Sequence, residues 1–289
     1  MGPAYGEQRQ RGICMWSIRD EWRKHRAFRE VWVGYLLGAA YLLFSLIQYW
    51  RYGFPSSWFE IQQDIYLYGN TLTAFLIVMG LPRLMCCEQE YGTVHTIRVS
   101  ERGTFLVWRS KSLFAVGYCA AVVAVIGTVS LLFHGGLIGF RDALAPVLES
   151  QAFSSELPPL SNLTYCIVQY GFLFLGAVYF AGFVLLAAQI TQRTTLTIFL
   201  CGGVYLALLG CAAAIHFSIQ DIQQPFTLMD LPFLLLQSVS FAAFMSQQNF
   251  SHLFIRQWND IWKPVALVIL LSGLEFGASW RLWRRRARA

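Results

Sequence analysis

The stretch EQEYGTVHTIRVSERGTFLVWRSK, from Glu88 to Lys111, is the longest polar passage between two apolar segments of this 289-residue chain. Basic residues are frequent in and just before it: Arg83, Arg98, Arg102, Arg109 and Lys111. The apolar segments on either side approach the roughly 20 residues that a helix needs to cross the hydrocarbon core of a bilayer. The passage therefore predicts an aqueous loop between two membrane-spanning helices.

The composition of the whole chain agrees with a membrane location. Hydrophobic residues make up 56% of it and charged residues only 13%, whereas soluble domains carry about 25% charged residues. Strands of a membrane barrel would alternate apolar and polar residues with period two, but the long segments here are apolar on all sides. We therefore expect an all-α, polytopic membrane protein.

Six segments are long and apolar enough to be membrane spans. They are predicted at 31–50, 65–85, 112–133, 166–188, 195–216 and 263–283. Residues 17–30 mix aromatic side chains with five basic ones, a composition typical of a helix at the headgroup surface. The expected organisation is a cytoplasmic N-terminus with an interfacial helix (1–30), a six-helix membrane domain (31–283) and a basic cytoplasmic tail (284–289).

The distribution of basic residues predicts the orientation, because lysine and arginine are retained on the cytoplasmic side. Eighteen of the 22 lie in the N-terminal segment, the passage 83–111, the 189–194 loop and the C-terminus, and four lie in the intervening loops. Six spans with both termini in the cytoplasm fit this distribution. Segment 231–246 is apolar but short, which favours an extracellular re-entrant or interfacial segment; if it crossed, the C-terminal arginines would move outside.

No catalytic or metal-binding motif is found in the sequence. It has neither a Gly-x-x-x-x-Gly-Lys-Ser/Thr loop nor a His-Glu-x-x-His pair, and its five histidines are scattered over both sides of the membrane. Most of the seven cysteines lie in spans, where a thiol acts as a small hydrophobe; a redox role of Cys86–Cys87 is the alternative. We expect no enzymatic activity, cofactor or metal in this chain.

Two spans carry stripes of small and polar residues. One face of the first span bears Gly34, Gly38, Tyr41, Ser45 and Gln48, and one face of the second bears Tyr66, Asn70 and Thr73. The stripes either line a translocation path or a dimer interface, or pack against helices of the same subunit. Glu275 is the one acid well inside a span, which marks a functional site by default; a structural hydrogen bond or ion pair is the alternative.

A short cytoplasmic helix is predicted from about Glu88 to Val99, with Tyr91, Val94 and Ile97 on one side, ended by Gly103. It joins two spans, so a push on it would move both membrane helices. This is the arrangement expected of an element that transmits force from a cytoplasmic partner.

The passage resembles the signature of ABC transporter type-2 (export-type) permeases. That family carries an acid and then Gly-Thr after the second span, and a lysine at the start of the third. Glu88 and Glu90 precede Gly92–Thr93 here, and Lys111 stands at the lysine position. The family's proline and arginine positions are taken by Glu101 and Thr104. The layout of interfacial helix, six spans, coupling helix and re-entrant segment is also similar.

The resemblance implies a permease subunit of an ATP-driven exporter in a bacterial cytoplasmic membrane. Two permease subunits, identical or different, would pair with two ATP-binding subunits that hold ATP and Mg, and no nucleic acid is involved. The residues expected to couple to the ATPase are Glu88, Glu90, Tyr91, Gly92, Thr93, Val94, Ile97 and Arg98. The cargo is expected to be amphipathic: a peptide, a drug or a lipid-like molecule.

A secondary, proton-coupled transporter centred on Glu275 is the alternative function. Such carriers often contain internal repeats with broken helices, and no convincing repeat is found in this sequence.

Overall fold

The computed structural model describes residues 18–52, 57–64, 68–93, 103–148, 159–220 and 261–288. In these residues the chain forms eight helices: α2 (Ile18–Ala27), α3 (Arg29–Tyr52), α4 (Trp58–Asp64), α5 (Asn70–Glu90), α7 (Gly103–Ile138), α8 (Asn162–Thr191), α9 (Thr194–Gln220) and α13 (Trp262–Arg288). No strand is formed by these segments apart from a single bridge between Pro146 and Ser161. The expectation of an all-α fold is confirmed.

Six of the helices are long and apolar enough to cross a membrane. They are α3, α5, α7, α8, α9 and α13, and each overlaps one of the six segments expected from the sequence; α5 begins at Asn70 and ends at Glu90, five residues later at each end than expected. The chain is therefore a multi-pass membrane protein with six candidate spans.

The boundaries differ from expectation most at the third span. Apolar content predicts it at 112–133, but α7 has 36 residues and already begins at Gly103. Polar residues such as Arg109 and Lys111 continue the same helix, so apolar content alone underestimates its length. Similarly, α13 continues through Arg284–Arg286 to Arg288, so the expected separate tail is largely helical.

The helix expected from Glu88 to Val99 does not begin at Glu88. Residues 88–90 are the last turn of the second span, and Tyr91 caps α5. Gly92 then adopts φ +68°, a left-handed conformation that ends a helix and that glycine tolerates best. Residues 94–102 lie outside the described part of the chain, as does the segment 231–246.

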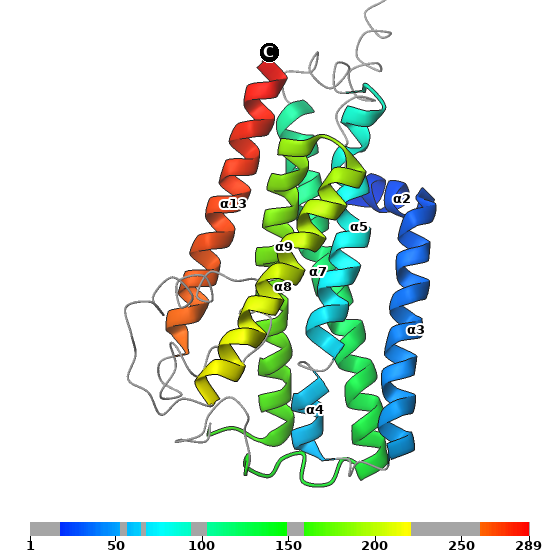
Figure 1. Ribbon diagram of the computed structural model, residues 1–289, viewed down its shortest axis with the longest axis vertical. Coiled ribbons are helices and arrows are strands. Elements are labelled where there is room, and N and C mark those ends of the chain that lie inside the picture. The colour runs from blue at the N-terminus through cyan, green and yellow to red at the C-terminus, as the bar shows by residue number, and fades with distance from the viewer. Residues whose placement is uncertain are drawn as a thin grey trace, which may run out of the picture.

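Helices α5 and α8 form the centre of the bundle, and α3, α9 and α13 lie at its periphery (Figure 1). α13 packs along α8, and α3 packs mainly on α5. The core contains large side chains that are almost fully buried, for example Ile77, Leu81, Tyr165, Leu173 and Phe180.

The two ends of the bundle are built from different elements. At the upper end in Figure 1 lie the end of α5, the start of α7, the α8–α9 turn and the C-terminus, with α2 crossing just below them. The end of α3, α4 and the end of α7 lie at the lower end. The helix nearest the N-terminus and the C-terminus thus lie toward the same end, as six spans require. That this end faces the cytoplasm stays a prediction from the charge distribution.

Candidate functional site

A cluster of four charged side chains, three of them buried, joins α2, α5 and α7 at the upper end of the bundle. Lys111 Nζ lies 2.5 Å from Glu88 Oε2, and Lys24 Nζ lies 3.0 Å from Glu88 Oε1. Lys24 also pairs with Glu21 at 3.3 Å. Glu21, Glu88 and Lys111 are at most 3% exposed. The two carboxylates and two ammonium groups balance each other, which is the condition under which charges tolerate burial.

The positions of these side chains follow from the ends of two helices. Glu88 lies in the last turn of α5, and Lys111 lies in the third turn of α7. Lys111 also donates a hydrogen bond to the carbonyl of Leu84 on α5. The C-terminal end of a helix carries partial negative charge. A lysine from the neighbouring helix is therefore well placed there.

Helix α2 is held against the bundle by His25 as well as by the charged cluster. His25 Nε2 lies 2.7 Å from the hydroxyl of Tyr35, and the imidazole packs against the rings of Phe114 and Tyr118 at 5.1 Å each. Burial lowers the pKa of His25 to about 4, so the ring is neutral at physiological pH. α2 is therefore packed onto the protein on its Glu21–His25 face.

Burial shifts the pKa of the neighbouring acid, Glu21, in the opposite direction. It raises the pKa of Glu21, and this effect is opposed by the nearby ammonium groups of Lys111 and Lys24. The carboxyl of Glu21 thus depends on both lysines for its charged form.

Glu90 links the end of α5 to the start of α9. Its Oε2 lies 2.5 Å from Arg83 Nη1, and its Oε1 accepts a hydrogen bond of 2.6 Å from the backbone N–H of Thr194. Thr194 is the first residue of α9, where unpaired N–H groups and the helix dipole favour a carboxylate. Arg83 also donates to the hydroxyl of Tyr91 at 2.8 Å.

Further hydrogen bonds bring α8 and α13 into the same end. Gln89 donates to Gln189 of α8 at 3.3 Å. With its amide oxygen turned toward α13, Gln192 in the α8–α9 turn accepts from Arg286 at 2.7 Å. Trp283 of α13 donates to the carbonyl of Thr104 at 2.9 Å. Separate polar contacts at this end therefore link α5, α7, α8, α9 and α13, and α3 joins them through the contact of Tyr35 with His25.

The structure divides the expected coupling residues into buried and exposed ones. Glu88 is buried and holds helices together, so it is not available on the surface. Tyr91 is 62% exposed, and Gly92 and Thr93 are exposed beside it. Val94, Ile97 and Arg98 lie outside the described residues. The surface that a partner could contact here is therefore the turn 91–93.

The two glycines of the first stripe pack within the chain. A Cβ atom on Gly34 would lie 2.7 Å from Cβ of Met79, and one on Gly38 would lie 2.9 Å from a methyl group of Leu76. Both neighbours belong to α5, so the Gly34-x-x-x-Gly38 spacing lets α3 and α5 approach closely. Of the two possible uses of this stripe, packing inside the subunit accounts for its glycines.

The polar members of that stripe lie further along α3. Tyr41 is 40% exposed, Ser45 donates a hydrogen bond to its carbonyl at 3.0 Å, and Gln48 is half-buried. This half of the stripe is less enclosed than the glycine half, and a path or interface role for it stays a prediction.

The second stripe points into the bundle. Asn70 and Thr73 are buried, and Asn70 accepts a hydrogen bond of 2.9 Å from the hydroxyl of Tyr205 on α9. Tyr66 lies outside the described residues. This bond gives Asn70 a partner inside the protein and ties α5 to α9.

Glu275 lies between α13 and α8. A Cβ atom on Gly182 of α8 would lie 2.6 Å from Glu275 Oε2, so the glycine makes room for the carboxyl group. Oε2 is buried and forms no hydrogen bond with the described residues. A polar atom in this state is costly unless something else satisfies it.

Sequence reasoning missed a second buried polar group, at the lower end of the bundle. Asp64 Oδ2 accepts hydrogen bonds from Tyr68, at 2.6 Å, and from Ser130, and it lies 3.1 Å from His134 Nε2. Ser130 and His134 are spaced i, i+4, and so are Asp64 and Tyr68. In a helix this spacing places both members of a pair on one side, and it is the sequence pattern that indicates the site. The histidines look scattered in the sequence because the acid that faces His134 lies 70 positions earlier.

No metal site is found in the described residues. No group of three or more His, Cys, Asp or Glu side chains there is placed to hold a metal. Cys86 and Cys87 are buried free thiols, and Cys87 donates to the carbonyl of Leu84 at 3.1 Å. The sulfur of Cys87 also lies 3.8 Å from the ammonium group of Lys111.

Comparison with known proteins gives no match: no protein-family model, curated protein or solved structure is similar to this chain.

Proposed function

We propose that the chain is the membrane-spanning subunit of an ATP-driven exporter of the ABC type-2 kind. The observation that carries this proposal is the Glu88–Lys111 ion pair. These are the acid before Gly92–Thr93 and the lysine of the next span on which the resemblance rests, and they lie 2.5 Å apart and buried. Residues that are 23 positions apart in the sequence thus form one structural unit.

This unit is suited to transmitting motion from the upper end of the bundle. The ion cluster fixes α2, α5 and α7 to one another, and Glu90 fixes α5 to α9. Because buried charges separate only at a large energetic cost, a force on the exposed turn 91–93 would move these helices together and not one at a time.

Under this proposal, ATP hydrolysis takes place on another chain. The sequence has no phosphate-binding loop of the Gly-x-x-x-x-Gly-Lys-Ser/Thr type, so ATP and Mg bind to a partner ATP-binding subunit. A ligand shifts a conformational equilibrium only through different affinities for the two states. ATP bound between two partner subunits supplies this difference, and a second permease subunit completes the translocation path.

Copurification tests the proposal. The full chain is co-expressed with a candidate ATP-binding subunit, and both the recovered complex and its rate of ATP hydrolysis are measured. We expect a complex whose ATP hydrolysis falls in Glu90→Ala, because that change releases both Arg83 and the start of α9. Arg51→Gln, in the exposed last turn of α3 at the opposite end of the bundle, serves as the control and should behave as wild type.

A complex that does not form, or one in which Glu90→Ala and Arg51→Gln behave alike, would contradict the proposed coupling end. Misfolding of Glu90→Ala is checked separately: the variant should still purify as a monodisperse protein in detergent.

The alternative, a proton-coupled transporter, is favoured by one observation. Glu275 Oε2 is buried between α13 and α8 without a hydrogen-bond partner among the described residues, as expected of a carboxyl that exchanges protons. In cells, export of amphipathic drugs would then be abolished by Glu275→Gln and by an uncoupler, and it would not depend on any ATP-binding subunit. Export that persists in Glu275→Gln excludes this alternative.

A further inference from the structure

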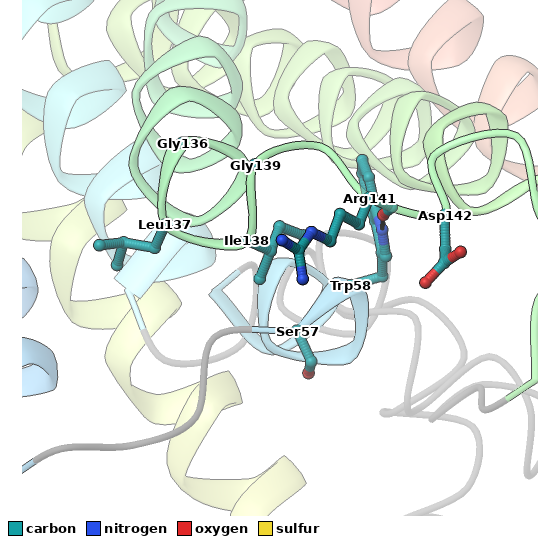
Figure 2. Close-up of a pocket in the computed structure, with 8 residues that line it drawn as sticks. All are labelled: Ser57, Trp58, Gly136, Leu137, Ile138, Gly139, Arg141 and Asp142. Carbon is teal, nitrogen blue, oxygen red and sulfur yellow. Dashed lines mark hydrogen bonds between the residues drawn. The ribbon is translucent and has the colours of Figure 1, made fainter.

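A pocket of about 560 Å³ lies at the lower end of the bundle, between α4 and the end of α7. Figure 2 shows Ser57 and Trp58 on one wall and the segment from Gly136 to Asp142 on the other. The end that holds this pocket is opposite to the one that carries the ion cluster, so the proposed coupling makes no use of it.

The pocket is lined by residues that follow the apolar segment expected at 112–133, where lipid headgroups are expected. With a rise of 1.5 Å per residue, a helix of 36 residues is about 54 Å long, whereas a bilayer with its headgroups is about 40–45 Å thick. The apolar segment expected from the sequence ends at 133, and the last residues of α7 follow it. Leu137, on the pocket wall, is nevertheless 55% exposed, as expected of a side chain that contacts acyl chains where they meet the headgroups.

Two opposite charges line the pocket without neutralising each other. Arg141 and Asp142 are both exposed, and neither forms an ion pair among the residues that the structure describes. In Figure 2 the guanidinium of Arg141 and the carboxylate of Asp142 lie apart along the pocket. A ligand with one negative and one positive group would engage both.

The hydroxyl group of Ser57 also lines the pocket. Ser57 accepts a hydrogen bond of 3.3 Å from the backbone N–H of Glu60, so its own proton remains free to donate. A guanidinium and a hydroxyl donor together suit a phosphate group, which guanidinium binds through two parallel hydrogen bonds.

The backbone of this turn is held in an unusual conformation. Gly139, Phe140 and Asp142 all have positive φ, at 66°, 51° and 56°, which is rare for residues other than glycine. The turn is fixed by Trp58, which donates to the carbonyl of Arg141 at 2.7 Å, and by Asn162, which donates to the carbonyl of Asp142 at 3.0 Å. Strained backbone that its surroundings hold in place is concentrated at binding sites.

From these observations we propose that the pocket binds the zwitterionic headgroup of a membrane phospholipid of the phosphoethanolamine type. The phosphate contacts Arg141 and Ser57, the primary ammonium contacts Asp142, and an acyl chain runs along Leu137. The inference is independent of the proposed export function, because binding needs no ATP-binding subunit.

Native mass spectrometry of the full chain tests this site. The protein is delipidated in detergent and mixed with equal amounts of phosphatidylethanolamine, phosphatidylglycerol and phosphatidylcholine. We expect phosphatidylethanolamine to be retained about tenfold over each of the others, the change that one charged hydrogen bond produces. Phosphatidylglycerol has no ammonium group, and the quaternary ammonium of phosphatidylcholine has no proton to donate.

Variants separate the two contacts. Arg141→Gln should lower the retention of phosphatidylethanolamine and phosphatidylglycerol alike, whereas Asp142→Asn should remove only the preference between them. Asparagine tolerates the positive φ of this position, and the bond from Trp58 is to a backbone carbonyl, so both variants should fold. Arg51→Gln is the control, since Arg51 lies in the last turn of α3, at the same end of the bundle but outside the pocket.

Equal retention of phosphatidylethanolamine and phosphatidylglycerol, or an unchanged preference in Asp142→Asn, would overturn the proposal. Glycerophosphoethanolamine, which carries the same headgroup without acyl chains, distinguishes a lipid from a soluble ligand. It should not displace phosphatidylethanolamine at equal concentration; if it does, the ligand comes from solution and the lipid assignment is wrong.

Discussion

At the scale of single residues, Lys111 is the side chain on which the upper end of the bundle depends most. It is 3% exposed and pairs with a carboxylate that is equally buried. An ion pair in such surroundings adds little stability over apolar residues, but removing one partner leaves the other charge buried and alone. The pair thus favours one arrangement of α5 and α7, and the loss of either partner destabilises the fold.

Replacing Lys111 by methionine should lower the free energy of unfolding in detergent by about 3–5 kcal/mol. Arg83→Met is the matched control. Its pair with Glu90 is about one fifth exposed, and exposed pairs contribute about 1 kcal/mol or less. Equal losses in the two variants would show that Lys111 is not the central contact of this end.

His25 gives a second prediction, on pH. Its pKa is about 4 in the folded protein and about 6.5 in an unfolded chain. The unfolded state therefore binds more protons at His25 between these values, so the contribution of His25 to stability is complete above pH 6.5 and falls by roughly 3 kcal/mol as pH drops to 4. The thermal unfolding midpoint of the wild type should include this contribution of His25, together with those of other buried groups such as Glu21.

His25→Phe keeps an aromatic ring and removes the titration. Glu21, whose raised pKa acts with the opposite sign and favours the folded state at low pH, is present in both proteins, so its effect cancels in the difference. The fall between pH 6.5 and 4 should be smaller in His25→Phe. Parallel curves would mean that protons bind equally to His25 in both states.

At the scale of elements, the contact between α3 and α5 depends on Gly34. Alanine at this position would bring its Cβ to within 2.7 Å of Met79 Cβ, and overpacking of this kind costs about 1–3 kcal/mol. A Cβ atom on Gly117 of α7 would meet none of the described residues within 4 Å, so Gly117→Ala should be neutral or stabilising by up to about 1 kcal/mol. If chemical denaturation gives the two variants the same stability, the close approach of α3 and α5 is not needed.

Elements were predictable where they depend on composition, and not where they depend on contacts. Apolar length was sufficient to find all six spans, because a bilayer imposes that length on any helix that crosses it. It did not reveal α4, a seven-residue helix, nor the end of α5 at Glu90. α5 ends just before Gly92, which has a positive φ. A single backbone conformation of this kind leaves no repeating pattern in the sequence.

The sites were predictable only in part, for the same reason. Glu88 and Lys111 were found through a resemblance, but their partners Glu21 and Lys24 lie on a helix whose composition predicts a place at the headgroup surface. Asp64 and His134 were not found at all, since a pair that is 70 positions apart in the sequence is visible only after folding.

At the scale of the whole molecule, the two ends of the bundle have different chemistry. The upper end carries the ion cluster, the carboxylate at the start of α9 and an exposed turn at 91–93. The lower end carries the buried Asp64–His134 pair and the pocket lined by Arg141 and Asp142. Under the proposed function, the first faces an ATP-binding subunit and the second faces the outer leaflet.

The most direct measurement of this claim is site-specific photo-crosslinking in membranes that contain both the chain and its candidate ATP-binding subunit. A photoreactive phenylalanine derivative replaces Tyr91, which is 62% exposed, or Leu144, which is 84% exposed beyond the end of α7. We predict a crosslink to the ATP-binding subunit from position 91 and none from position 144. A crosslink from position 144, or none from position 91 in a complex that copurifies, would contradict the account.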